Sequence, residues 1–284
     1  MFPNTVEPLQ YRRIRQGYIR SQQVDHRNPL VSRLAYLWAF HYGGGRNARN
    51  LASGAEAYAG GINAGVTWGA CQDGFVPIIN GANQIQIGPS QKMSVQGGGP
   101  ISLFVRYQWI SGAGELFSAW DYGYSLRACW RNTQNTDGSI TSSIRDGGGN
   151  FSTASTPGVV VKDSMTSYGV TVNQGQYVNE SLYVNGVFLG TGGGTAASIP
   201  SAEYSDYNIG RSFDSVGTLV AYIALVAVWV GRRLVPAEMT SLHADPYQLL
   251  LTIPQHRRYW WDVGVSAPPP VATVEDASVI SMWS

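Results

Sequence analysis

Short apolar runs separated by glycine-rich turns recur along this chain from residue 34 to residue 230. Examples are "LAYLWAF", "ISLFVRYQWI", "TSYGVTVNQ" and "YIALVAVWV". Runs of this length, rich in β-branched and aromatic residues and bounded by turn formers, are typical of strands. With 34 glycines and only 13% charged residues among 284, the composition also suits an antiparallel β protein better than a disordered one.

Two segments indicate how these strands are arranged. In "LYVNGVFL", Asn185 and Gly186 lie between two alternating apolar runs, which predicts a two-residue type I′ hairpin because both central residues need positive φ. Residues 218–230 are apolar on both faces, as in a central strand that is covered on each side. Many short strands at regular spacing therefore predict an all-β fold, a two-sheet antiparallel jelly-roll sandwich.

One short helix is predicted near the C-terminus, in "LVPAEMTSLHADP". Pro236 fits the first helical position, where its missing N–H costs nothing. Met239 and Leu242 are three residues apart and share a face, so we expect them to cover an end of the sandwich. The residue before Pro246 is pushed out of helical geometry, and the helix should end near Ala244.

The order of these segments resembles a known family. The segments follow one another as in laminin-G-like jelly rolls of the concanavalin A-like lectin/glucanase superfamily. They are an opening apolar strand, an "ARNLASG" segment, a mid-chain strand, a "LYVNG" hairpin, an "IGR" and a closing "L-x-x-A-E-M" helix. The matching residues are 34–40, 48–54, 101–109, 182–186, 209–211 and 234–239. The resemblance covers roughly residues 31–252 and implies that this part is one sandwich domain.

The end of the domain resembles a narrower group. "EMTSLHADPYQLL", followed by a basic "HRR", is similar to the subgroup found in structural proteins of tailed phages and prophages. This resemblance implies a virion protein, made in the host cytoplasm and carried on the phage particle.

No catalytic, cofactor or metal site is predicted. Glycosidases of this superfamily carry two carboxylates that face one groove, yet no strand-like run contains E-x-D or D-x-E. Related domains often hold calcium through acidic residues of the last strand, where this chain has Ala224 and Leu225. A calcium site through Asp206 or Asp214 would have few carboxylates, so we interpret both as solvated loop residues.

The cysteines and the apolar runs point to a chain that folds in the cytosol. Cys71 and Cys129 are predicted to be buried thiols, and a disulfide between them stays an alternative. The N-terminus has no apolar signal core. The longest apolar run, about 13 residues, is shorter than the roughly 20 that a membrane-spanning helix needs.

Aromatic residues around "AWDYGY" offer a candidate sugar-stacking platform. Trp120, Tyr122 and Tyr124 alternate along the chain. The alternative, which we favour, is that these rings fill the space between the two sheets.

Both ends of the chain have a composition unlike the sandwich. We predict an extended basic arm over residues 1–30 and an extended aromatic, proline-rich tail over residues 253–284, on either side of a sandwich over residues 31–252. Tryptophan and arginine are enriched at binding hot spots, which makes the ends candidate partner-binding segments. The residues concerned are Arg12, Arg13, Arg15, Tyr18, Arg20, Arg257, Arg258, Tyr259, Trp260, Trp261 and Trp283.

Two other interpretations of the ends stay open. The tail, and Tyr259–Trp261 in particular, could fold back onto its own sandwich. The arm could bind nucleic acid, but the eight arginines of residues 1–50 are spread over about forty positions and the isoelectric point is only 7.8. We therefore expect neither a nucleic-acid nor a membrane partner.

Taken together, these features favour a non-enzymatic phage virion structural protein. The leading hypothesis is a capsid decoration (cement) or minor head protein, anchored to the major capsid protein or to adjacent head or tail subunits by its terminal arms, and forming a homo-oligomer. The alternative is a carbohydrate-binding module of a phage tail or fibre that adheres to host glycans.

Overall fold

The computed structural model describes residues 19–40, 47–48, 50–52, 60–62, 65–81, 83–87, 99–121, 127–146, 149–173, 178–196, 207–210 and 217–253. Every strand pairing in these residues is antiparallel, and the main sheet curls into two layers. The front sheet runs in the order β3 (Asn47–Ala48), β4 (Gly60–Ile62), β7 (Ile85–Ile87), β16 (Tyr207–Ile209), β9 (Gly114–Asp121), β10 (Arg127–Gln134), β11 (Ile140–Arg145) and β12 (Phe151–Ser155). The back sheet continues as β15 (Val187–Gly194), β14 (Asn179–Val184), β13 (Met165–Asn173), β8 (Ile101–Ser111), β17 (Val220–Val230), β6 (Gly74–Asn80) and β5 (Thr67–Cys71), with β2 (Leu34–Ala39) also paired to β17.

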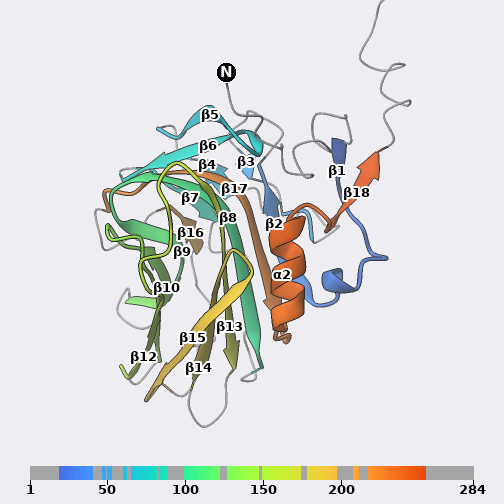
Figure 1. Ribbon diagram of the computed structural model, residues 1–284. Helices are drawn as coiled ribbons and strands as arrows, with labels where there is room; N and C mark the ends of the chain where they lie inside the picture. Colours follow the sequence, from blue (N-terminus) through green and yellow to red (C-terminus); the bar gives the residue numbers. More distant parts are fainter. Residues whose placement is uncertain are drawn as a thin grey trace, which may run out of the picture.

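The two sheets lie face to face and enclose the main hydrophobic core (Figure 1). They join at one seam, where β12 and β15 share two pairs of residues, Ser152 with Gly194 and Thr153 with Gly193. Burial alternates along β11 and β12, as expected when one face of a strand points inward. The predicted all-β jelly-roll sandwich with one short C-terminal helix is thus confirmed.

The Asn-Gly hairpin forms as predicted. Asn185 and Gly186 join β14 to β15 and adopt φ values of 52° and 77°. Positive φ at both central positions is the signature of the type I′ turn, whose twist matches that of the flanking strands.

The apolar run of residues 218–230 becomes the central strand of the back sheet. β17 pairs with β8 along its whole length and with β2 and β6 on its other side. Residues of β17 enter both hydrophobic clusters, Val226 and Val228 on the inner face and Leu225 and Trp229 on the outer face. The absence of polar alternation therefore has a structural cause, because both faces of the back sheet are covered.

Helix α2 (Pro236–Ala244) covers the outer face of the back sheet (Figure 1). Its bounds and its buried residues, Met239 and Leu242, are as predicted. Its place is not, because the helix lies along the sheet face rather than across an end of the sandwich. Gly169 of β13 allows this close approach, since a β-carbon there would lie 2.7 Å from the sulfur of Met239.

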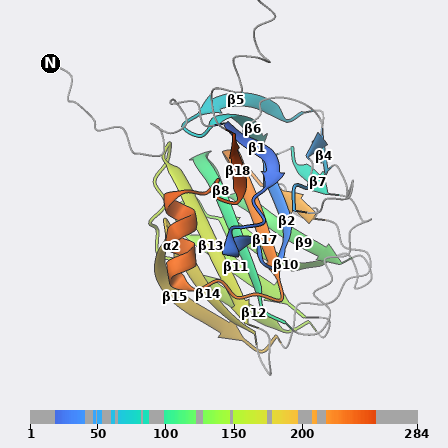
Figure 2. The ribbon, with the colours of Figure 1, turned by 90° about the vertical axis from the view of Figure 1, so that its right-hand side faces the viewer.

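Residues 19–31 differ from the extended arm that the sequence predicts over residues 1–30. β1 (Ile19–Val24) pairs with β18 (Leu250–Ile253), and the 3₁₀ helix η1 (Pro29–Val31) packs beside α2 on the back sheet (Figure 2). Leu30 is buried there, and its carbonyl accepts a 2.6 Å hydrogen bond from the indole of Trp229. The physical reason is the exposed apolar face that β17 and β2 would otherwise present.

Several predicted features lie at the margin of the structure or outside it. Cys71 has a free, half-buried thiol, whereas the side chain of Cys129 in β10 lies outside the described residues, as do Asp206 and Asp214. In the described ranges, no helix is long and apolar enough to cross a bilayer.

Candidate functional site

The outer face of the front sheet is the open counterpart of the covered back sheet. On the back sheet, α2, η1 and β18 fill the outer face with a second apolar cluster. On β10, β11 and β12 the outward residues are polar or aromatic and remain half-buried or exposed. Below, "the outer face" used alone means this surface of β10, β11 and β12. It consists of Arg131, Thr133, Thr141, Ser143, Arg145, Phe151, Thr153 and Ser155.

Strand register brings the outward residues into rows. Arg131 of β10 lies opposite Ser143 of β11, which lies opposite Thr153 of β12. The same register places Arg145 opposite Phe151 at one side of this row. Hydroxyl, guanidinium and aromatic groups therefore alternate over a surface three strands wide.

Phe151 is the main aromatic group of the outer face. Phe151 is 53% exposed, and the guanidinium of Arg145 lies 4.9 Å from the ring centroid. An exposed aromatic ring on a rigid strand can stack on the apolar face of a sugar ring, because two χ angles are all that must be fixed. Phe151 was not among the residues predicted from the sequence. The alternation of "FSTAS" indicates an outward-facing residue, but it does not indicate which residues of the neighbouring strands lie beside it.

Two hydroxyls lie four residues along the strands from Arg145 and Phe151, at the other end of this surface, and are held in place by their neighbours. The hydroxyls of Thr141 and Ser155 lie 3.1 Å apart, and the amide of Asn135 donates to Thr141 at 3.0 Å. Such groups both donate and accept, as the hydroxyls of a sugar require. These hydroxyls are therefore suited to recognise a polyhydroxylated ligand.

Charge on the outer face is mainly positive. The Nε atom of Arg131 lies 3.6 Å from Oε1 of Glu115, whose side chain is almost fully buried. Arg145 makes no ion pair with any described residue, and its only described partner is the Phe151 ring. The face thus carries one guanidinium that is balanced by a carboxylate and one that is not.

The polar row continues across the sheet beyond β10. Arg131 lies opposite Ser118 of β9, which lies opposite Asn208 of β16, which in turn lies opposite Gln86 of β7. Ser118 and Asn208 are buried, so the accessible part of the row is its end on β10, β11 and β12.

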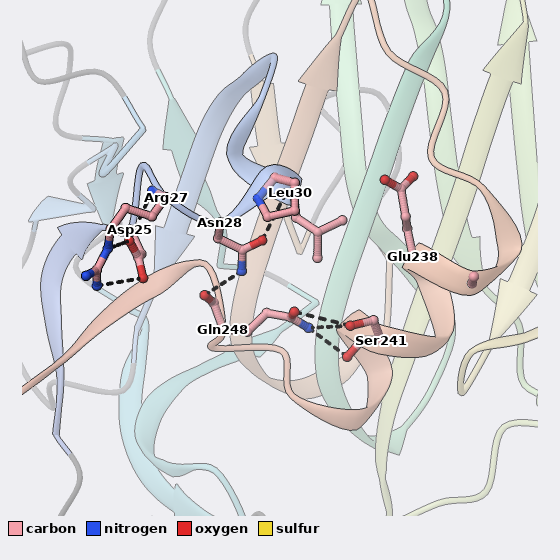
Figure 3. A pocket seen from close by; sticks show the side chains of 9 residues that line it. Asp25, Arg27, Asn28, Leu30, Glu238, Ser241 and Gln248 are labelled. Atoms are coloured by element: carbon pink, nitrogen blue, oxygen red, sulfur yellow. Dashed lines mark hydrogen bonds and ion pairs between the residues drawn. The ribbon is translucent and has the colours of Figure 1, made fainter.

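A hollow lies on the opposite layer, between η1 and α2. It is a groove of about 750 Å³ lined by Asp25, Arg27, Asn28, Pro29, Leu30, Ala237, Glu238, Ser241 and Gln248 (Figure 3). Asn28 donates to the Gln248 carbonyl at 2.9 Å, and the Gln248 amide donates to the Ser241 carbonyl at 2.7 Å. These bonds hold the N-terminal segment against the helix, and the groove is a joint between them.

The carboxylates of Glu115 and Glu180 and the hydroxyl of Ser167 are buried and do not form an accessible catalytic group. Glu115 is buried on the outer side of the front sheet, whereas Glu180 lies between the two sheets. The two carboxylates are therefore on opposite sides of the front sheet. The hydroxyl of Ser167 lies 2.7 Å from Nδ1 of His243, but Ser167 is 1% exposed beneath α2. Among these residues no three acidic, histidine or cysteine side chains gather as metal ligands.

The structure places few of the site residues predicted from the sequence. Trp120 lies in β9, but its side chain lies outside the described residues, as do Tyr122 and Tyr124. The backbone of Arg20 lies in β1. The other predicted partner-binding residues also lie outside the description: Arg12, Arg13, Arg15, Tyr18, Arg257, Arg258, Tyr259, Trp260, Trp261 and Trp283.

The two ends of the described chain lie side by side. Ile19 at the start of β1 pairs with Ile253 at the end of β18. The ribbon that they form lies on the α2 side, whereas β10 and β12 belong to the other layer (Figures 1 and 2). The chain therefore continues in both directions from a single point that faces away from the outer face.

Comparison with solved structures finds several proteins that contain a similar fold. The binding domain of Paraclostridial Mosquitocidal Protein 1 matches with a TM-score of 0.58 and 12% identity over 75% of this chain and 52% of that one. The botulinum neurotoxin type G receptor-binding domain matches with a TM-score of 0.52 and 13% identity over 76% and 54%. Trypanosoma rangeli sialidase in complex with sialic acid matches with a TM-score of 0.56 and 14% identity over 77% and 34%.

These similarities concern the fold alone, because the identities are low. The chain spans about half of the two toxin domains and a third of the sialidase. No protein-family model matches the sequence, and no curated protein sequence matches it either. The comparisons thus support the jelly-roll β-sandwich fold.

Proposed function

We propose that this protein is a non-enzymatic glycan-binding module that holds its ligand on the outer face of β10, β11 and β12. The observation that carries the proposal is the exposed ring of Phe151, set on a rigid strand among outward hydroxyl groups. Flat sheet surfaces with an aromatic ring and oriented hydroxyls can satisfy both the apolar and the polar sides of a sugar.

Two further points support this proposal. Two of the similar solved structures are described as binding or receptor-binding domains, and the sialidase structure contains sialic acid. Glu115, Glu180 and Ser167 are all buried, so none of these three can reach a ligand as an acid, base or nucleophile. Binding without catalysis fits this set of residues better than glycan cleavage does.

Replacing Phe151 by alanine tests the proposal. Loss of a half-exposed ring that becomes covered by ligand should cost about 1–2 kcal/mol of binding free energy, or roughly a five- to thirtyfold rise in Kd. Glycan-array screening followed by isothermal titration with the best ligand measures this change. Phe75→Ala is the matched control, because Phe75 is 48% exposed on β6, in the other layer. An array without any bound glycan, or equal losses for the two variants, would exclude the proposal.

A second candidate function is attachment to a larger particle through the chain ends. The pairing of Ile19 with Ile253 favours it, because both terminal segments then start from one point on the side away from the outer face. Together with the resemblance to phage structural proteins, this supports a virion component that is anchored by its ends and presents its outer face. Decoration protein of the head and adhesion module of a tail or fibre are both compatible with such an arrangement.

Removing residues 1–18 and 254–284 tests attachment while leaving the β1–β18 ribbon intact. The trimmed chain should unfold at the same temperature as the full chain but be absent from virus particles purified from the producing cells. Quantitative mass spectrometry of those particles measures the copy number of each form. Full occupancy by the trimmed chain would exclude anchoring by the ends.

A further inference from the structure

Arg131, Arg145 and Phe151 form a stepped cluster across three neighbouring strands. Arg145 lies opposite Phe151, and Arg131 lies opposite Ser143, two residues before Arg145. Arg131 and Arg145 are therefore diagonal neighbours, a relation in which β-carbons lie about 7–8 Å apart and long side chains can reach one another's ligand. Arg145 is therefore the guanidinium nearest to Phe151, and Arg131 lies one strand further away.

The charge of this cluster is only partly balanced by nearby acids. Oε1 of the buried Glu115 lies 3.6 Å from Nε of Arg131, so the carboxylate partly neutralises the charge of that guanidinium. The carboxylate of Asp146, next to Arg145 in sequence, instead accepts hydrogen bonds from the backbone and the amide of Asn150, at 2.8 and 2.9 Å. Arg145 is thus a cation at the surface whose described contact is an aromatic ring.

An arginine held over an aromatic ring is well placed for an anion. The ring fixes the plane of the guanidinium without using its N–H groups, so these donors remain free to form paired hydrogen bonds with a carboxylate. Arginine suits a planar carboxylate better than a point-charge cation would, because its donors match the two oxygens. The neighbouring hydroxyls of Ser143 and Thr153 are available for the remaining polar groups of the ligand.

We infer that the ligand of the outer face is an acidic glycan, with a carboxylated pyranose that stacks on Phe151 and places its carboxylate on Arg145. This inference rests on the proposed glycan-binding function and adds the charge of the ligand.

Carboxyl reduction of the ligand provides the sharpest test. Oligogalacturonate and a sialylated oligosaccharide are each compared with their carboxyl-reduced counterparts, in which only the acid is replaced by an alcohol. At least one acidic glycan should bind roughly tenfold more tightly than its reduced form, because hydrogen bonds to charged groups are the stronger ones. The difference should shrink in 0.5 M salt. The two acids distinguish hexuronic from sialic acid as the source of the carboxylate.

Arg145→Gln should abolish this preference, so that the acidic and the reduced glycan bind equally. Arg27→Gln is the control, since Arg27 is an arginine that lies beside η1 on the other layer. Equal binding of acidic and reduced glycans, a preference that survives in Arg145→Gln, or equally tight binding of polyglutamate would overturn the inference and leave glycan binding standing. Failure of every glycan to bind would overturn the proposed function as well.

Discussion

Replacing Asp73 by alanine should destabilise the folded protein by about 3–5 kcal/mol, because it leaves a buried guanidinium without its counter-charge. Asp73 lies in the turn between β5 and β6, and its Oδ2 atom accepts a hydrogen bond of 3.0 Å from Nε of Arg106. Both side chains are almost fully buried, with 4% and 2% exposure. The hydroxyl of Tyr247 also approaches Oδ2, at 3.4 Å.

This ion pair connects three distant parts of the chain. Arg106 comes from the centre of β8, Asp73 from the β5–β6 turn, and Tyr247 from the segment after α2. Burial, followed by the negative charge of Asp73, raises the pKa of the Tyr247 phenol well above its ordinary value. The phenol therefore stays protonated, so that it can donate to the carboxylate at any ordinary pH.

Urea denaturation of Asp73→Ala measures the effect, and Arg27→Ala is the control. Arg27 makes an ion pair of the same 3.0 Å length with Asp25, but its side chain is 84% exposed, so only a small change is expected. The double variant Asp73→Ala with Arg106→Met should recover most of the lost stability, because it removes both buried charges. Equal effects of Asp73→Ala and Arg27→Ala would show that burial does not set the strength of this contact.

Changing Glu180 to glutamine should stabilise the protein above pH 7 and have little effect near pH 4.5. Glu180 of β14 lies inside the sandwich, where its Oε1 accepts a hydrogen bond of 3.2 Å from Ser152 of β12. Its Oε2 is buried with no hydrogen-bond partner among the described residues. Burial raises the pKa of Glu180 to about 7, and the hydrogen bonds from Ser142 and Ser152 only partly oppose this.

The direction of the pH effect follows from proton binding. From pH 4.5 to about pH 7, the folded state keeps a proton on Glu180 that the unfolded state has released. Stability therefore falls as pH rises through this interval, by about 3 kcal/mol in total, and changes no further above it. Glutamine is neutral throughout, so the variant lacks this contribution to the pH dependence.

Thermal unfolding at pH 4.5, 6 and 8 measures the difference between Glu180→Gln and the unchanged protein. A gain of about 3 kcal/mol at pH 8 corresponds to a rise of roughly 6–12 °C in Tm for a domain of this size. The same difference at all three pH values would contradict a proton-linked role. Because Glu180 bonds across the interior to β12, the strand that carries Phe151, loss of stability at high pH should begin at the seam between the sheets.

The fold was predictable where local chemistry decides conformation. The Asn185-Gly186 turn requires positive φ at both residues, and Pro236 and Pro246 bound the helix by their missing N–H groups and their steric demands. The apolar run in β17 likewise predicted a strand covered on both faces. These features depend on a few neighbouring residues and so can be read from the sequence alone.

The candidate site was not predictable in the same way. The aromatic residues that were singled out in the sequence, Trp120, Tyr122 and Tyr124, have side chains outside the described residues, so their prediction stays untested. Phe151 and Arg145 lie on separate strands and become neighbours only through the register of β11 with β12. An alternating strand shows that one face is exposed, but not which strands flank it or which residues share that face.

What the sequence determined by itself was therefore the set of strands, the hairpin, the helix and the unusual composition of the two ends. Tertiary structure alone decided that α2 and residues 19–31 cover the back sheet, that β1 and β18 bring the chain ends together, and that the front sheet keeps an open face. The reason is physical: turns and helix ends depend on short-range sterics, whereas coverage of a sheet depends on which distant apolar segments reach it first and bury the most surface.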